Sequence, residues 1–169
     1  MTDSAAAEAI YESPFGPIFL RADYDALLKL YFVDDAAIVN IGASPKSSVL
    51  TQTFHWLDQY FSGQQPSFCP PIRLSLTPFN TRVLEIASQV KFGETITYGM
   101  IAEVIAAERG LAKMSVRAVG SAMHRNPICL IVPCHRVVGA NHHLGGYNGN
   151  PARKRQLLAH EGVDISNLI

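Results

Sequence analysis

Three consecutive residues, Cys134, His135 and Arg136, follow a short apolar stretch and carry groups that could act together. A cysteine is a nucleophile only as the thiolate, and a free thiol is mostly protonated at pH 7. The histidine could accept the thiol proton, and the arginine could stabilise the negative charge that remains. The tripeptide therefore predicts a reactive Cys134, with an inert buried cysteine as the competing interpretation.

The backbone conformation at Cys134 decides whether His135 can reach the thiol. The preceding apolar residues favour an extended segment, in which neighbouring side chains point to opposite sides. In that geometry a bridging water, or a turn, must connect the two side chains. An imidazole also needs an acceptor that fixes its tautomer, and Glu161 is the nearest downstream carboxylate. We therefore expect a relay from Cys134 through water to His135 and Glu161.

The cysteine pattern indicates free thiols and no metal site. The chain has three cysteines, Cys69, Cys129 and Cys134, without a Cys-x-x-Cys pair or a signal peptide. Before residue 76 only His55 and Cys69 could bind zinc, which is too few for a tetrahedral site. Packing is the expected role of Cys129, although an influence on the size of the groups that the site around Cys134 accepts is an alternative. We expect no metal and no cofactor.

Composition and charge narrow the class of protein. The 169 residues are 48% hydrophobic and 17% charged, which suits a globular chain, and no apolar run is long enough to cross a membrane. Overall charge cancels, but residues 111–160 hold seven Lys and Arg residues and no acidic one. This stretch fits a polyanion such as nucleic acid and fits an ordinary solvated surface equally well.

The first part of the chain predicts a small sheet with one helix. Residues 11–23 have the strand formers and turn residues of a strand pair, and residues 27–33 form another strand candidate. Residues 47–61 place apolar side chains at helical spacing, with Trp56 expected in the core. A proline-rich stretch over residues 63–71 follows and is the best linker candidate.

The second part predicts helices. Thr77-Pro78 has the form of a helix N-terminus, and residues 98–107 and 113–124 form two short helices around a turn that contains Gly110. This pair fits a helix-turn-helix. Residues 141–150 should form an exposed loop or wing, and residues 151–160 a last helix. The basic cluster over residues 153–155 either contacts phosphates or forms a solvated face.

Several motifs together resemble the O6-alkylguanine-DNA alkyltransferases, also called methylated-DNA–protein-cysteine methyltransferases. They cover residues 76–163 and follow one another in the family's order. In chain order they are Val90–Tyr98, Arg117–Met123, Asn126-Pro127 followed by Pro133–Val137, Gly146–Gly149 and Lys154–Gly162. The N-terminal third matches only in general character. The resemblance implies an α/β (α+β) fold. A small ribonuclease H-like sheet-and-helix domain with a proline-rich linker would span residues 1–75, and a winged helix-turn-helix domain residues 76–169.

The resemblance also implies a reaction. Cys134 would take the alkyl group from O6-alkylguanine, and from O4-alkylthymine, in duplex DNA, irreversibly and once per molecule. Arg117 would enter the minor groove where the damaged nucleotide is flipped out. Tyr98 would supply a proton to the leaving guanine, and Asn126 would brace the turn at the active site.

Further residues are implied as binding groups. Met123 and Tyr147 would line the pocket, while the carbonyl of Val137 and the amide of Asn148 would read the guanine. Asn148 stands where several relatives have serine. Lys113 and Arg125 are the expected DNA contacts beside Arg117.

The implied partner is double-stranded DNA carrying O6-alkylguanine. The protein would bind it as a monomer, and no membrane would be involved. The location would be the cytoplasm, near the nucleoid in a prokaryote, or the nucleus of a eukaryote. One alternative is a non-catalytic sensor of alkylguanine, but such relatives lack the reactive cysteine. A second alternative is a Cys/His hydrolase, which would leave the helix-turn-helix and Arg117 without a role.

Overall fold

A computed structural model describes residues 6–34, 41–42, 45–147 and 150–169. The chain forms two compact units. The first comprises Met1–Ser75 with Pro127–Cys129, and the second comprises Leu76–Asn126 with Leu130–Ile169. The sequence-based division after residue 75 stays a prediction, and it does not anticipate the return of Pro127–Cys129 to the first unit.

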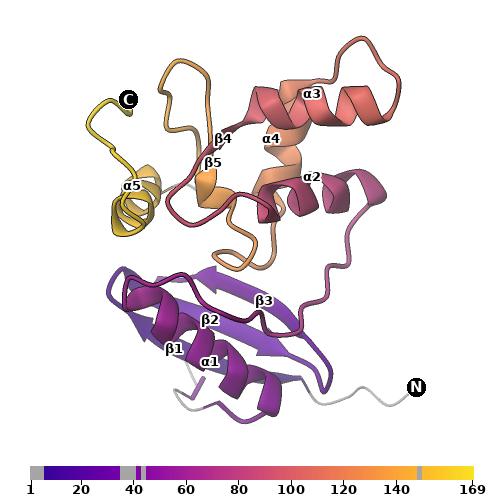
Figure 1. Ribbon diagram of the computed structural model, residues 1–169. Helices are drawn as coiled ribbons and strands as arrows, with labels where there is room; N and C mark the ends of the chain where they lie inside the picture. The colour runs from indigo at the N-terminus through magenta and orange to yellow at the C-terminus, as the bar shows by residue number, and fades with distance from the viewer. Residues whose placement is uncertain (1–5, 35–40, 43–44, 148–149) are drawn as a thin grey trace. The chain divides into compact units, whose positions relative to one another are not determined.

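The first unit is an antiparallel sheet covered by one helix (Figure 1). Its strands are β1 (Ala7–Ser13), β2 (Gly16–Ala22) and β3 (Leu27–Phe32), in the order β1-β2-β3. The predicted strand pair and third strand are confirmed, although β1 begins four residues earlier than the predicted segment. Alternating residues of the strands, such as Ile18 and Leu20, are fully buried, as expected for a sheet with one covered face.

The covering helix is α1 (Ser48–Phe61), as the sequence predicts. The Ser47 hydroxyl caps it by accepting a hydrogen bond from the Leu50 N–H at 3.2 Å. Trp56 is buried and stacks on Tyr60, with 5.4 Å between ring centroids, so its predicted place in the core is confirmed.

Pro127–Cys129 runs beside β3 as a short parallel bridge. The Leu30 N–H donates to the Pro127 carbonyl at 2.9 Å, and the Cys129 N–H donates to the Leu30 carbonyl at 2.7 Å. Cys129 is buried there, which confirms that it packs in the interior.

The second unit is mainly helical. It contains α2 (Pro78–Ser88), α3 (Tyr98–Glu108), α4 (Val116–His124) and α5 (Pro151–His160). Helix α4 packs against both α2 and α3 (Figure 1). The helix predicted from residue 113 begins instead at Val116, because the Ser115 hydroxyl accepts from the Ala118 N–H and thereby fixes the start.

A two-residue parallel pairing joins distant segments of the second unit. Strand β4 (Ile96–Thr97) pairs with β5 (Val137–Val138), with Ile96 opposite Val137. Because Tyr98 follows β4 directly and Cys134 lies three residues before β5, this pairing brings both side chains to the same region. No helix in the described parts of the chain has the length and apolar character needed to cross a membrane.

Candidate active site

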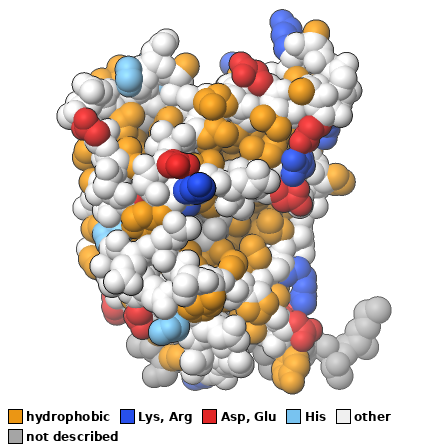
Figure 2. All heavy atoms as spheres, in the orientation of Figure 1, with side chains coloured by type: hydrophobic (Ala, Val, Ile, Leu, Met, Phe, Trp, Pro, Cys, Tyr) orange, Lys and Arg blue, Asp and Glu red, His pale blue; other side chains and the backbone are white. Residues whose placement is uncertain are grey.

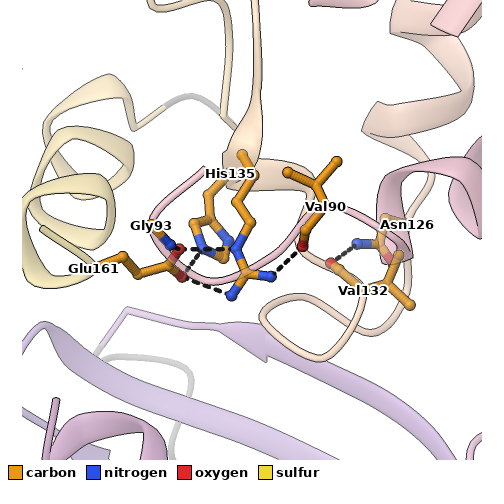
Figure 3. A network of polar contacts seen from close by, with 7 residues as sticks. Val90, Gly93, Asn126, Val132, His135 and Glu161 are labelled. Atoms are coloured by element: carbon orange, nitrogen blue, oxygen red, sulfur yellow. Dashed lines mark hydrogen bonds and ion pairs between the residues drawn. The ribbon is translucent and has the colours of Figure 1, made fainter. Parts of the chain in front are cut away.

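Cys134 lies in a turn, not in an extended strand. Residues Cys134–Arg136 form one turn of 3-10 helix, in which the Arg136 N–H donates to the Pro133 carbonyl at 2.9 Å. The expected extended geometry is therefore wrong. The Asn126 side chain donates to the Val132 carbonyl at 2.8 Å and so fixes the chain just before the turn (Figure 3).

Behind the turn, Glu161 collects hydrogen bonds from several directions (Figure 3). His135 Nε2 lies 2.6 Å from Glu161 Oε1. Arg136 donates to the same carboxylate through Nε at 2.8 Å and through Nη2 at 3.0 Å. The Gly93 N–H adds a further bond at 3.2 Å. The His135–Glu161 pair that the sequence predicts is therefore formed, and Arg136 serves as an ion-pair partner within it.

Gly93 suits this position because its backbone lies in the left-handed region, at φ 82°. A Cβ atom there would stand 3.0 Å from the backbone oxygen of Glu161. A larger residue would thus be strained and would press on the carboxylate's own backbone. The third nitrogen of Arg136, Nη1, donates to the Val90 carbonyl at 2.7 Å, which ties the same loop to the turn.

These contacts set the charges behind Cys134. Burial alone would raise the pKa of Glu161, but the hydrogen bonds and charges of His135 and Arg136 outweigh it and lower the pKa to about 2. Burial lowers the pKa of His135 despite the opposing effect of Glu161. At neutral pH the carboxylate is therefore ionised while the imidazole is neutral and able to accept a proton.

In front of Cys134 lies a cavity of about 420 Å³. Its lining residues come from α3, α4, the cysteine turn and the loop before α5: Tyr98, Gly120, Met123, His124, Cys134, Gly146 and Tyr147. Burial and the charge of Cys134 both raise the pKa of Tyr98, which keeps its hydroxyl protonated. The thiol of Cys134 and the hydroxyl of Tyr98, a nucleophile and a hydrogen-bond donor, therefore line the same cavity.

Lys154 is the residue that sequence reasoning misplaced. It is fully buried, so it does not lie on a solvated face or reach phosphates. Its ammonium donates to the Val137 carbonyl at 2.6 Å and to the Gly146 carbonyl at 3.3 Å. Burial lowers its pKa to about 8, and the negative charge of Cys134 partly offsets that effect. Lys154 stands between two other basic residues, Arg153 and Arg155, so the sequence gave no signal that this one side chain points inward.

The structure unites most of the predicted site residues. Cys134, Tyr98, Met123 and Tyr147 face one cavity together with Gly146, which belongs to the motif Gly146–Gly149. Gly120 and His124 join them without having been predicted as site residues. The Val137 carbonyl accepts a hydrogen bond from Lys154. Asn148 lies outside the described residues. The roles of all these residues in binding and catalysis stay predictions.

The predicted DNA contacts lie apart from the buried network. Lys113, Arg117 and Arg125 are exposed, before, on and after α4. On the face that Figure 2 shows, basic and acidic side chains are scattered among apolar ones and form no continuous basic surface. Within the residues that the structure describes, no group of three or more His, Cys, Asp or Glu side chains could hold a metal ion.

Fold and site together define a protein in two parts, a small sheet-and-helix unit and a helical unit that carries a cysteine with a prearranged charge network. Residues 78–163 match the family model described as the DNA-binding domain of 6-O-methylguanine DNA methyltransferase. Residues 7–74 match the ribonuclease-like domain of the same proteins. The chain belongs to the methylated-DNA–protein-cysteine methyltransferase family.

Individual relatives agree with this assignment. A methylated-DNA–protein-cysteine methyltransferase of Sulfurisphaera tokodaii is 36% identical over 95% of this chain and 96% of its own. One of Mycobacterium leprae is 38% identical over 87% of each chain. Among solved structures, the Mycobacterium tuberculosis protein OGT in complex with DNA is 34% identical, covers 96% of this chain and 94% of its own, and has a TM-score of 0.78.

Proposed function

We propose that this chain repairs DNA by transferring the alkyl group of O6-alkylguanine to Cys134, irreversibly and once per molecule. The observation that carries the proposal is the position of Cys134, between the cavity in front and the His135–Glu161 pair behind. The names of the relatives and the DNA complex of the similar mycobacterial protein support it. O4-alkylthymine is a second substrate of the same chemistry.

The substrate base must leave the double helix to reach the cavity. A base inside a duplex does not expose its O6 atom to a buried thiol, so the nucleotide has to be flipped out. In the proposed complex Arg117, which is exposed in the first turn of α4, fills the gap from the minor groove. Lys113 and Arg125, exposed near the two ends of the same helix, would contact phosphates.

Methyl transfer begins with removal of the thiol proton. The thiol of Cys134 gives its proton, through a water, to His135, and Glu161 stabilises the imidazolium that forms. The thiolate attacks the methyl carbon, so that a sulfur–carbon bond forms as the carbon–O6 bond breaks. The bonding electron pair stays on the guanine. Tyr98 donates its proton to the departing guanine, and the proton that His135 received from the thiol returns through solvent to the Tyr98 oxygen, so that both side chains end neutral.

Other groups orient the base in the cavity. Met123 and Tyr147 provide apolar and aromatic walls. The Val137 carbonyl accepts from Lys154 with one lone pair, and its second lone pair can accept from the guanine amine. Asn126 holds the turn in register for this contact. The thioether product is a poor leaving group, and this explains a single use per molecule.

The decisive experiment measures the mass of the intact protein after incubation with duplex DNA that carries O6-methylguanine. We expect a gain of one methylene unit, mapped to the Cys134 peptide and saturating at one per chain. The variant Cys134→Ser should gain nothing, whereas Cys69→Ser, which changes an exposed cysteine, should react normally.

Two other outcomes would reject the proposal. Tight binding to the lesion without a mass gain would indicate a non-catalytic sensor of alkylguanine. Repeated turnover without a stable adduct would indicate a hydrolase.

A further inference from the structure

The segment that follows α5 folds back onto the second unit. Its apolar side chains Val163, Ile165 and Leu168 pack against a buried cluster of Val138, Leu144 and Leu158. We call residues 163–169 the tail. Partial burial of these three apolar side chains stabilises the tail in this position.

The tail is also hydrogen-bonded to the loop between β5 and α5. The Ile169 N–H donates to the His142 carbonyl at 2.9 Å, and the Leu144 N–H donates to the Ile169 carbonyl at 2.7 Å. These two bonds lie on either side of His143. The loop backbone at residues 142–144 is therefore fixed by the tail.

Arg155 in turn fixes the tail to the helix. Its guanidinium donates through Nη1 to the Ile165 carbonyl at 3.1 Å and through Nη2 to the Leu168 carbonyl at 2.7 Å. Charge-assisted bonds of this kind are stronger than bonds between neutral groups, and the planar guanidinium sets their direction. A continuous set of contacts thus runs from α5 through Arg155 and the tail to the loop.

The loop needs such support because its backbone is not relaxed. Asn141 and His142 have φ angles of 53° and 63°, in the left-handed region that residues other than glycine rarely adopt. The same loop continues into Gly146 and Tyr147, which line the cavity in front of Cys134. At that end Lys154 donates to the Gly146 carbonyl, so the loop is anchored at both ends.

We propose that Arg155 is a positioning residue for alkyl transfer: by holding the tail against residues 142–144, it sets the place of the cavity wall formed by Gly146 and Tyr147. This inference rests on the proposed function, because the wall matters only if a base is seated against it. Arg155 touches neither the cavity nor Cys134, so its effect is on the seating of the base and not on the thiol.

The test compares two alkyl donors on the variants Arg155→Met, Arg155→Lys and Arg21→Met. The last makes the same substitution at an exposed ion pair of the first unit. The free base O6-methylguanine has to be seated against the wall, whereas iodoacetamide reacts with the thiol without being seated. We expect Arg155→Met to slow transfer from the free base about tenfold and to leave the iodoacetamide rate unchanged. Arg155→Lys should recover part of the loss, and Arg21→Met should match the wild type.

Hydrogen exchange of the peptide over residues 141–147 separates this inference from the proposed function. We expect faster exchange in Arg155→Met than in Arg21→Met, whether or not the protein transfers alkyl groups. If the wild type fails to react with O6-methylguanine in DNA, the proposed function fails while the exchange result still tests the hold of the tail. Unchanged exchange in Arg155→Met, or equal losses with both alkyl donors, would overturn the role of Arg155.

Discussion

The two sides of Cys134 are built differently. Behind it, one buried carboxylate, Glu161, is fixed by His135, Arg136 and the backbone of Gly93 at distances between 2.6 and 3.2 Å. In front of it, Tyr98, Met123 and Tyr147 come from separate segments and enclose a cavity. The charge environment is therefore set before any substrate arrives, while the substrate side depends on how α3, α4 and the loop before α5 are positioned around the cavity. The two sides can therefore be perturbed separately.

The largest effect on stability should come from the rear side. Glu161→Gln leaves the guanidinium of Arg136 buried without its carboxylate, and breaking such a pair costs about 3–5 kcal/mol in the free energy of unfolding. Urea unfolding measures this loss. The matched control is Glu108→Gln, which breaks the exposed pair with Arg82 and should change stability much less. Equal losses in the two variants would contradict a special role for the buried network.

Acid should act on the same side. Above its ordinary pKa of 4.5, Glu161 is ionised in both the folded and the unfolded chain; below it, the unfolded chain takes up the proton first, since the folded pKa is about 2. The stabilisation by this carboxylate, on the order of 3 kcal/mol, should thus be lost as the pH falls from about 5 to about 2. The lowered pKa of His135 adds a loss of the same sign below pH 6.5.

Unfolding measured between pH 5 and pH 3 tests this dependence. The stability of Glu161→Gln should fall less steeply with decreasing pH than that of the wild type. Parallel curves would show that other carboxylates dominate.

On the front side, Tyr98→Phe should slow alkyl transfer about a hundredfold, because the departing guanine loses its proton donor. The free energy of unfolding should change by less than about 1 kcal/mol, within the range for a lost hydrogen bond. Rapid-quench kinetics with O6-methylguanine in DNA gives the rate, and iodoacetamide checks that the thiol is unaltered. A variant that transfers at the full rate would remove Tyr98 from the mechanism.

The smallest effect concerns the spent protein. A methyl group on Cys134 enlarges a side chain that is only 7% exposed, and overpacking of this kind costs about 1–3 kcal/mol. We expect the methylated protein to melt a few degrees below the unmodified one. Differential scanning calorimetry before and after the reaction measures the change. An unchanged or raised Tm would show that the cavity absorbs the methyl group.

Short-range sequence signals were sufficient to predict most of the helices. Ser47, Thr77 and Pro151 mark the starts of α1, α2 and α5 because caps and N-terminal prolines act within one turn of the residue that carries them. The pairing of β4 with β5 has no such signal, since each strand has only two residues and the paired residues lie 41 positions apart.

The candidate site shows the same limit. The apolar residues before Cys134 favoured an extended chain, but contacts to Asn126 and Glu161 hold a turn there. Lys154 stands between Arg153 and Arg155 in a helix that reads as polar, and only packing shows that it is buried. The residues around the cavity were predicted from the motif resemblance, because local sequence signals do not indicate which distant segments come together.

The return of Pro127–Cys129 to β3 affects how the nucleophile's surroundings can form. Leu30 and Cys129 are about 100 positions apart, and contacts of such separation form slowly because a long loop must close first. A fragment that starts at residue 76 would keep Cys134 but lose Leu30, and with it both backbone bonds that hold the chain five to seven residues before the thiol. We therefore expect such a fragment to lose the fixed backbone at Pro127–Cys129, which in the full chain belongs to the first unit.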